Sequence, residues 1–171
     1  DLIKFSKKHK IKIASIADLI SYRLKNEKLI YKSFSKKIYF KKFKYNFHIY
    51  NNKLNNYKSF VISKGSFNKN NSVPVRVISK KINKNNLFSN KEIIKNFKIL
   101  SKFKNFIFII ITNEINKYKN NNDITLRYYG IGAQIIKDFN IKNMILLSRS
   151  RKKIISLEGF GLKIKKQIII K

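Results

Sequence analysis

A run of six apolar residues, FIFIII at 106–111, places the strongest limit on the fold. It is the longest uninterrupted apolar run in the chain, and a helix that spans a membrane needs about 20 such residues. Short apolar runs bounded by polar segments are typical of strands that are buried on both faces of a sheet. We therefore expect a central strand over 105–114, no membrane partner and a cytoplasmic protein.

The patterns on either side of this run predict an α+β (α/β-like) fold, a mixed sheet with flanking helices. Strands are predicted over 43–50, 57–63, 73–79, 105–114, 144–148 and 161–170. Helices are predicted over 90–104, 130–140 and 151–157. Before these elements, residues 1–33 predict a helix, a short strand at 11–15 and a second helix at 17–29, and 34–45 indicates a connection between two units.

The composition is dominated by residues whose codons are rich in A and T. Lys, Ile and Asn make up 88 of 171 residues, the formal net charge is +32, and only 5 of the 40 basic residues are Arg. A hydrophobic fraction of 43% excludes a disordered polycation. An A/T-rich genome explains the excess of Lys and the scarcity of Arg together, although Arg is the better residue for bidentate phosphate recognition.

Nucleic-acid binding stays open as an alternative explanation of the charge. It predicts a steep salt dependence of affinity and a basic face in which Tyr39, Phe40, Phe43 and Tyr45 interleave with cations. Codon bias predicts instead that cations cover the whole surface evenly.

The most specific motif is the string RYYGIGAQIIKDFNIKNMILLSRSRKKIISLEGFGLKI at 127–164. Four of the five Gly residues and one of the three Ala residues lie within it. The string resembles the end of the GTP cyclohydrolase II family, which carries Tyr-Gly-Ile-Gly-Ala-Gln, then Leu-Leu-Thr-Asn, then Gly-(Phe/Tyr)-Gly-Leu. The resemblance implies a GTP cyclohydrolase II-like fold, in which the small residues at 130–133 start a helix close against the sheet.

A second resemblance lies at the other end of the chain. The segment 1–30 resembles the last segment of 3,4-dihydroxy-2-butanone 4-phosphate synthase, through matches such as Phe5, His9 and the run Ser-Ile-Ala-Asp-Leu-Ile at 15–20. The two families occur fused in this order in riboflavin-biosynthesis proteins. We therefore interpret 1–33 as the C-terminal end of a synthase domain and 34–171 as a degenerate GTP cyclohydrolase II-like domain.

The resemblance implies a zinc hydrolase that opens the guanine ring of GTP and releases formate and pyrophosphate, but its chemistry is missing here. Zinc needs three thiolates in that family, and the chain has no Cys. Lys81 stands at the position of the first ligand, Ile78 at that of a family His, and Thr125 at that of the catalytic Asp. The phosphate-binding stretch is replaced by ITNEINKYKNNND at 111–123. We expect no zinc and no cyclohydrolase activity.

Three residues match positions that the family uses on its nucleotide. Arg127 stands at the position of the arginine nucleophile, and Ser148 and Lys153 stand at nucleotide-binding positions. We interpret all three as vestiges of a site; the alternative is that Arg127 and Lys153 are ordinary solvated cations.

We therefore expect the chain to be the C-terminal part of a 3,4-dihydroxy-2-butanone 4-phosphate synthase, which converts ribulose 5-phosphate to 3,4-dihydroxy-2-butanone 4-phosphate and formate. The acidic metal and acid/base residues are expected upstream, so Mg or Mn is expected there and no cofactor in this chain. The chain alone is expected to be inactive, structural and part of a homodimer. The alternative enzyme is a GTP cyclohydrolase II with atypical ligands.

Overall fold

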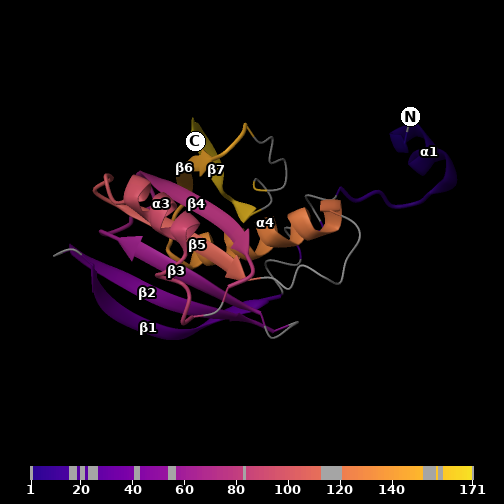
Figure 1. Cartoon of the computed structure of the whole chain (residues 1–171). Helices are drawn as coiled ribbons and strands as arrows, with labels where there is room; N and C mark the ends of the chain where they lie inside the picture. The colour runs from indigo at the N-terminus through magenta and orange to yellow at the C-terminus, as the bar shows by residue number, and fades with distance from the viewer. Residues whose placement is uncertain are drawn as a thin grey trace.

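The computed structural model contains one seven-stranded sheet, in the order β1-β2-β3-β5-β4-β6-β7 (Figure 1). The strands are β1 (Ile30–Phe40), β2 (Phe43–Asn52), β3 (Lys58–Lys64), β4 (Ser72–Lys80), β5 (Phe106–Thr112), β6 (Asn143–Ser148) and β7 (Lys163–Ile169). The helices are α1 (Leu2–His9), α3 (Lys91–Leu100) and α4 (Asn121–Asp138). The structure describes residues 2–15, 19, 22, 27–40, 43–53, 57–82, 84–112, 121–151, 157 and 160–170, without the side chains of 121–129.

The sheet changes from antiparallel to parallel at β5. The strands β1, β2, β3 and β5 pair antiparallel in succession. In contrast, β4 pairs parallel to both β5 and β6, and β6 pairs parallel to β7. Parallel neighbours need crossover connections, and α3 and α4 lie in two of them. The predicted mixed sheet with flanking helices is therefore confirmed.

The central strand β5 is covered by apolar side chains on both faces. Ile107, Ile109 and Ile111 pack in one layer with residues of α4, and Phe106, Phe108 and Ile110 pack in a second layer with residues of α3. Successive side chains of a strand point to opposite faces, so a strand between two layers must be apolar throughout. Each of these six residues is at most 1% exposed, which confirms the predicted buried strand.

Helix α3 begins as predicted and ends earlier than predicted. Asn90 is its N-cap, because the Asn90 side chain accepts hydrogen bonds from the amides of Glu92 and Ile93. The helix ends at Leu100, four residues before the predicted end at 104. The buried face of the helix also contains Asn96, a polar residue that the apolar spacing does not predict.

Two elements correct the sequence prediction. The segment 34–45 is not a connection, because β1 runs from residue 30 to 40 and pairs with β2 along its length. Helix α4 begins at Asn121, nine residues before the predicted start at 130. Gly130 and Gly132 therefore lie inside the helix, where backbone amides bond within the helix and are not free for an anion.

The N-terminal predictions have mixed outcomes. The predicted first helix is present as α1, which lies away from the sheet in Figure 1 and buries none of its residues. The predicted strand at 11–15 is wrong, since these residues form no strand and are exposed. The predicted helices at 17–29 and 151–157 fall largely outside the described residues. The proposed boundary at 33/34 falls within β1, and the assignment of 1–33 to another domain stays a prediction.

Close approach of α4 to the sheet depends on a small residue at position 132, which is Gly132. A Cβ atom at this position would lie 3.6 Å from a methyl group of Val77 on β4, which is ordinary van der Waals contact. A methyl group would therefore just fit, whereas a larger side chain would push the helix away from the sheet. No helix in the described part of the chain is long and apolar enough to cross a membrane.

Candidate functional site

The carboxyl ends of β4, β5 and β6 meet at one edge of the sheet, because these strands are parallel neighbours. The helix that follows β4 packs on one face, and the helix that follows β5 packs on the other face. Such a reversal is a topological switch point, where open α/β sheets usually bind ligands. Lys80, Thr112 and Ser148 are the last residues of the three strands.

Ser148 is the predicted nucleotide-binding residue whose surroundings the structure describes. Its side chain lies at the carboxyl end of β6 and is 5% exposed. The Ser148 Oγ donates a hydrogen bond to the carbonyl oxygen of Ser150, at 2.7 Å. Its hydroxyl hydrogen is therefore used within the loop that follows β6, which leaves only the oxygen lone pairs for a ligand.

The other predicted site residues are only partly described. Arg127 and Thr125 belong to α4 by backbone, but their side chains lie outside the described set, as does the whole of Lys153. Ile78, at the position of the family His, is buried in the apolar layer beneath α3. Lys81 is exposed directly after β4. Whether Arg127, Ser148 and Lys153 lie together stays a prediction.

A charged cluster beside this edge was not predicted from the sequence. The Glu92 carboxylate of α3 binds Lys80 of β4, with 2.5 Å between Nζ and Oε2, and Arg149, with 2.6 Å between Nη2 and Oε1. The carbonyl oxygen of Glu92 accepts a hydrogen bond from Asn96 Nδ2 at 2.8 Å. Asn96 Oδ1 in turn accepts from Arg76 Nε at 2.9 Å, and Arg76 Nη1 donates to the carbonyl oxygen of Leu147 at 3.1 Å.

The charges in the cluster shift the pKa values of Glu92 and Arg76. The hydrogen bond from Lys80 lowers the pKa of Glu92; partial burial opposes this shift, and the charges of Lys80, Arg149 and Arg76 reinforce it. Burial lowers the pKa of Arg76, and the charge of Arg149 lowers it further, while Glu92 partly offsets both effects. The cluster therefore favours an anion at Glu92 and leaves the buried Arg76 charge incompletely compensated.

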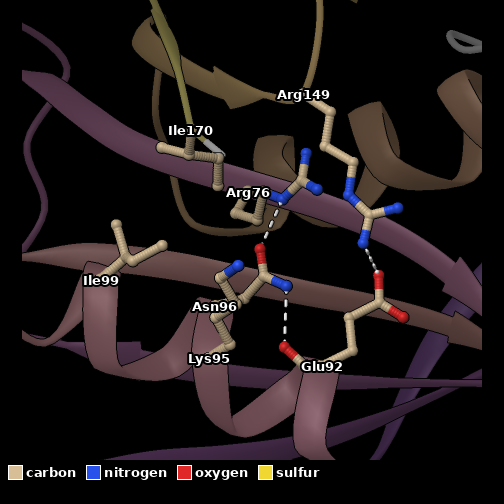
Figure 2. A pocket seen from close by; sticks show the side chains of 7 residues that line it. All are labelled: Arg76, Glu92, Lys95, Asn96, Ile99, Arg149 and Ile170. Carbon is tan, nitrogen blue, oxygen red and sulfur yellow. Dashed lines mark hydrogen bonds and ion pairs between the residues drawn. The ribbon is translucent and has the colours of Figure 1, made fainter.

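Figure 2 shows a pocket that opens next to this cluster, with Arg76 and Arg149 on one side and α3 on the other. Its lining residues are Arg76, Glu92, Lys95, Asn96, Ile99, Arg149 and Ile170. The cavity volume is about 30 Å³, enough for one or two water molecules. The Arg residues were the available sequence signal, because two of only five in the chain line this pocket.

A second polar cluster lies on the opposite face of the sheet, at the C-terminal end of α4. The Tyr50 hydroxyl donates to Asp138 Oδ2 at 2.7 Å, and Lys32 Nζ lies 3.1 Å from the same oxygen. Lys32 also lies 5.6 Å from the Tyr50 ring centroid. The buried His48 contacts Ser35 Oγ through Nδ1 at 2.9 Å and packs edge-on against Phe139. These contacts join α4 to the β1–β2 hairpin.

The pKa values of this second cluster follow from burial and pairing. Burial raises the pKa of Tyr50 far above its usual range, and the hydrogen bond to Asp138 adds to the shift. Burial also raises the pKa of Asp138, but the hydrogen bonds from Tyr50 and Lys32 outweigh it, so the pKa is lowered overall. Burial lowers the pKa of His48, and the Lys32 charge lowers it further. A neutral His48 and an ionised Asp138 are therefore favoured.

The residues present do not fit a zinc site of the thiolate type. The sequence has no Cys, and within the described residues no three His, Asp or Glu side chains gather where they could hold a metal ion. His9, which matches a synthase position, is exposed and packs against Phe5 at 4.4 Å between ring centroids. The prediction that this chain binds no zinc stays a prediction until metal content is measured.

The aromatic residues named for nucleic-acid stacking do not form one exposed platform. Tyr45 is 2% exposed, and its ring packs against Phe97 in the core. Phe40 also packs edge-on against Phe97, at 5.3 Å between centroids. Tyr39, next to the last residue of β1, and Phe43, the first residue of β2, are exposed, and Lys64 Nζ lies 5.0 Å from the Phe43 ring centroid. Of the four rings, Tyr45 is buried, whereas Phe40 is still 36% exposed beside its contact with Phe97.

Comparisons with known proteins agree with the C-terminal resemblance. The model of the GTP cyclohydrolase II family matches residues 109–169. This span runs from within β5 to the end of β7 and includes the string at 127–164 that carried the sequence argument. It includes Ser148 and the carboxyl end of β6, but not Lys80 or Glu92.

Relatives that match over the whole chain are riboflavin-biosynthesis proteins. The chain is 30% identical to riboflavin biosynthesis protein RibBA of Aquifex aeolicus, covering 100% of this chain and 49% of that protein. It is 30% identical to the 3,4-dihydroxy-2-butanone 4-phosphate synthase of Photobacterium phosphoreum (94% and 49%), and 28% identical to that of Wolinella succinogenes (99% and 48%). The chain thus spans about half the length of the curated relatives that it matches.

A solved structure has the same fold. RibBX, a two-domain 3,4-dihydroxy-2-butanone 4-phosphate synthase from A. baumannii, matches with a TM-score of 0.64 and 24% sequence identity. The match covers 99% of this chain and 49% of the RibBX chain. At this identity the likeness establishes the fold alone.

Proposed function

We propose that this chain is the C-terminal part of a 3,4-dihydroxy-2-butanone 4-phosphate synthase of riboflavin biosynthesis. Its substrate would be ribulose 5-phosphate, and its products 3,4-dihydroxy-2-butanone 4-phosphate and formate. The catalytic residues, with a Mg or Mn ion, would lie in the other half of a cytoplasmic protein. The names of the relatives and the share of each that the chain covers support this assignment.

We further propose that the GTP cyclohydrolase II-like half of this protein is degenerate and has a structural role in a homodimer. The observation that supports the loss of the zinc site is the carboxyl end of β4. Lys80 ends the strand and pairs with Glu92 of the same chain, and the exposed Lys81 follows it at the position of the first zinc ligand. Neighbouring cations repel a divalent metal, and the sequence offers no thiolate to offset that repulsion.

Ser148, Arg127 and Lys153 are proposed as vestiges of the nucleotide site. The hydrogen bond from Ser148 to Ser150 supports this view, because the hydroxyl group is committed to its own loop. Thr125 at the position of the catalytic base supports it as well, since a hydroxyl group does not accept a proton readily near pH 7.

Metal content and GTP turnover of the purified chain test the loss of the hydrolase. We expect no stoichiometric zinc and no formate from GTP above the protein-free blank. Stoichiometric zinc together with formate release would contradict the proposal and favour a cyclohydrolase with atypical ligands. The homodimer is tested by the molar mass of the intact gene product in light scattering, where a monomer would contradict it.

A further inference from the structure

The pocket beside Glu92 gathers more positive charge than its single described carboxylate can neutralise. Arg76, Lys95 and Arg149 line it together with Glu92, and Lys80 reaches the same carboxylate from the end of β4. These four cations come from three separate parts of the chain, namely β4, α3 and the segment after β6. Figure 2 shows the two Arg side chains directed toward α3 and its Glu92 and Asn96.

Codon bias does not account for this arrangement. The bias enriches Lys and depletes Arg, yet two of the five Arg residues lie here. Arg76 is also 7% exposed, and burial of a guanidinium is costly unless the charge is compensated. Its two described hydrogen bonds go to neutral acceptors, Asn96 Oδ1 and the carbonyl oxygen of Leu147. The buried charge thus depends for its compensation on anions across the pocket.

Glu92 makes the contacts that a bound oxyanion would make. One oxygen of its carboxylate accepts from Lys80 and the other accepts from Arg149. Charge-assisted contacts of this kind, from two cations to two oxygens of one group, are also how proteins hold carboxylate and phosphate ligands. The Glu92 side chain is 28% exposed, so an external anion could reach the same cations if the carboxylate charge were absent.

We propose that this pocket is a site for small oxyanions which the chain fills with its own Glu92 carboxylate, so that inorganic phosphate binds only when that carboxylate is neutralised. The inference concerns Arg76, Lys80, Glu92 and Arg149 and does not depend on the proposed function. It identifies Glu92 as the residue that closes the site.

Calorimetric titration of inorganic phosphate into the wild-type chain, Glu92→Gln and Glu92→Ala tests the proposal, at low ionic strength in a chloride buffer. Glu92→Gln removes only the carboxylate charge, whereas Glu92→Ala also vacates the space that the side chain fills. We expect at least a tenfold lower Kd for phosphate in Glu92→Ala than in the wild type, and a smaller gain in Glu92→Gln. Glu27→Gln is the matched control, because it makes the same change in net charge before β1, at the far edge of the sheet. Glu92→Asp, which keeps the charge, is expected to leave the site closed.

The double variant Glu92→Gln/Arg149→Gln identifies the pocket as the place of binding. We expect it to lose the gain in phosphate affinity. The proposal is overturned if Glu92→Gln binds phosphate no more tightly than the wild type, if Glu27→Gln gains as much, or if the double variant keeps the gain. Thermal unfolding by circular dichroism checks the fold of each variant, and if one of the two Glu92 variants does not melt cooperatively, the other is read by the same criteria.

Discussion

Two carboxylates tie helices to the sheet on its opposite faces, and they do so under different charge conditions. Asp138 meets one ammonium group and one phenol, from Lys32 and Tyr50. Glu92 meets two cations directly, and further cations line the adjacent pocket. The Asp138 cluster is balanced and packed among aromatic rings, whereas the Glu92 cluster carries surplus positive charge beside a cavity. The comparison indicates that the first is a structural joint and the second a closed anion site.

The largest effect on stability is expected for Asp138→Ala. This substitution removes the hydrogen-bond acceptor of the Tyr50 hydroxyl, and Tyr50 is only 2% exposed. A buried donor left without a partner costs about 1–3 kcal/mol, so the free energy of unfolding should fall by about 2 kcal/mol in urea titration. Tyr50→Phe removes the donor instead and should cost less, about 1 kcal/mol. Equal stability of Asp138→Ala and the wild type would refute the structural joint.

A smaller loss is expected for Glu92→Gln, about 1 kcal/mol, because the charged partner becomes a neutral amide whose single oxygen can still accept one of the two hydrogen bonds. Both carboxylates should therefore lower stability when removed, but only Glu92→Gln should bring phosphate binding with it. If Asp138→Asn gained the same phosphate affinity, the distinction between the two clusters would fail.

A pH effect should separate the Asp138 cluster from the rest of the chain. The pKa of His48 is lowered in the folded state, so the folded state binds this proton less readily than the unfolded state. The stabilisation that follows from a neutral His48 is fully present above the ordinary His pKa, near 6.5. It is lost progressively as the pH falls below that value. The melting temperature should therefore decline between pH 7 and pH 5.

His48→Gln should flatten this decline, and His9→Gln is the matched control on an exposed histidine. A second decline is expected as the pH falls below the ordinary carboxyl pKa values, near 4.5 for Glu and 3.8 for Asp, because the pKa values of Glu92 and Asp138 are lowered in the folded state. If the melting temperature of His48→Gln declines between pH 7 and pH 5 as steeply as that of the wild type, His48 is excluded as the source of the decline.

The smallest effect is expected for Arg149→Gln alone. The Arg149 side chain is 69% exposed, and exposed ion pairs contribute about 0–1 kcal/mol to stability. The free energy of unfolding should change by less than about 0.5 kcal/mol. A loss as large as that of Asp138→Ala would mean that the Glu92 cluster is itself a main structural joint.

Sequence patterns predicted the parallel half of the sheet better than the antiparallel edge. The run at 106–111 was informative because burial on two faces leaves a strong local pattern. Strand β1 was missed because it is an edge strand in which only Ile30 is buried, so burial imposes no alternation of apolar and polar residues on it. The start of α4 was missed because Asn121, Asn122 and Gly130 have low helix propensity, and packing against β5 overrides it.

The polar clusters could not be predicted because they join residues that are far apart in sequence. Arg76 lies in a stretch of β4 that is buried on both faces, where apolar side chains are expected, and Asn96 lies on the buried face of α3. Each residue looks like an isolated polar residue among apolar ones in its own element, because its partners lie in elements that only the fold brings next to it. The scarcity of Arg was the one usable signal. Arg127 and Ser148 were identified through a family motif, and only Ser148 has described side-chain surroundings.

Formate release by the intact gene product tests the central claim most directly, because both candidate reactions produce formate. Ribulose 5-phosphate and GTP are supplied in separate reactions with the same protein preparation and the same Mg concentration. The account predicts formate from ribulose 5-phosphate and none from GTP. Formate from GTP, or none from ribulose 5-phosphate, would contradict it.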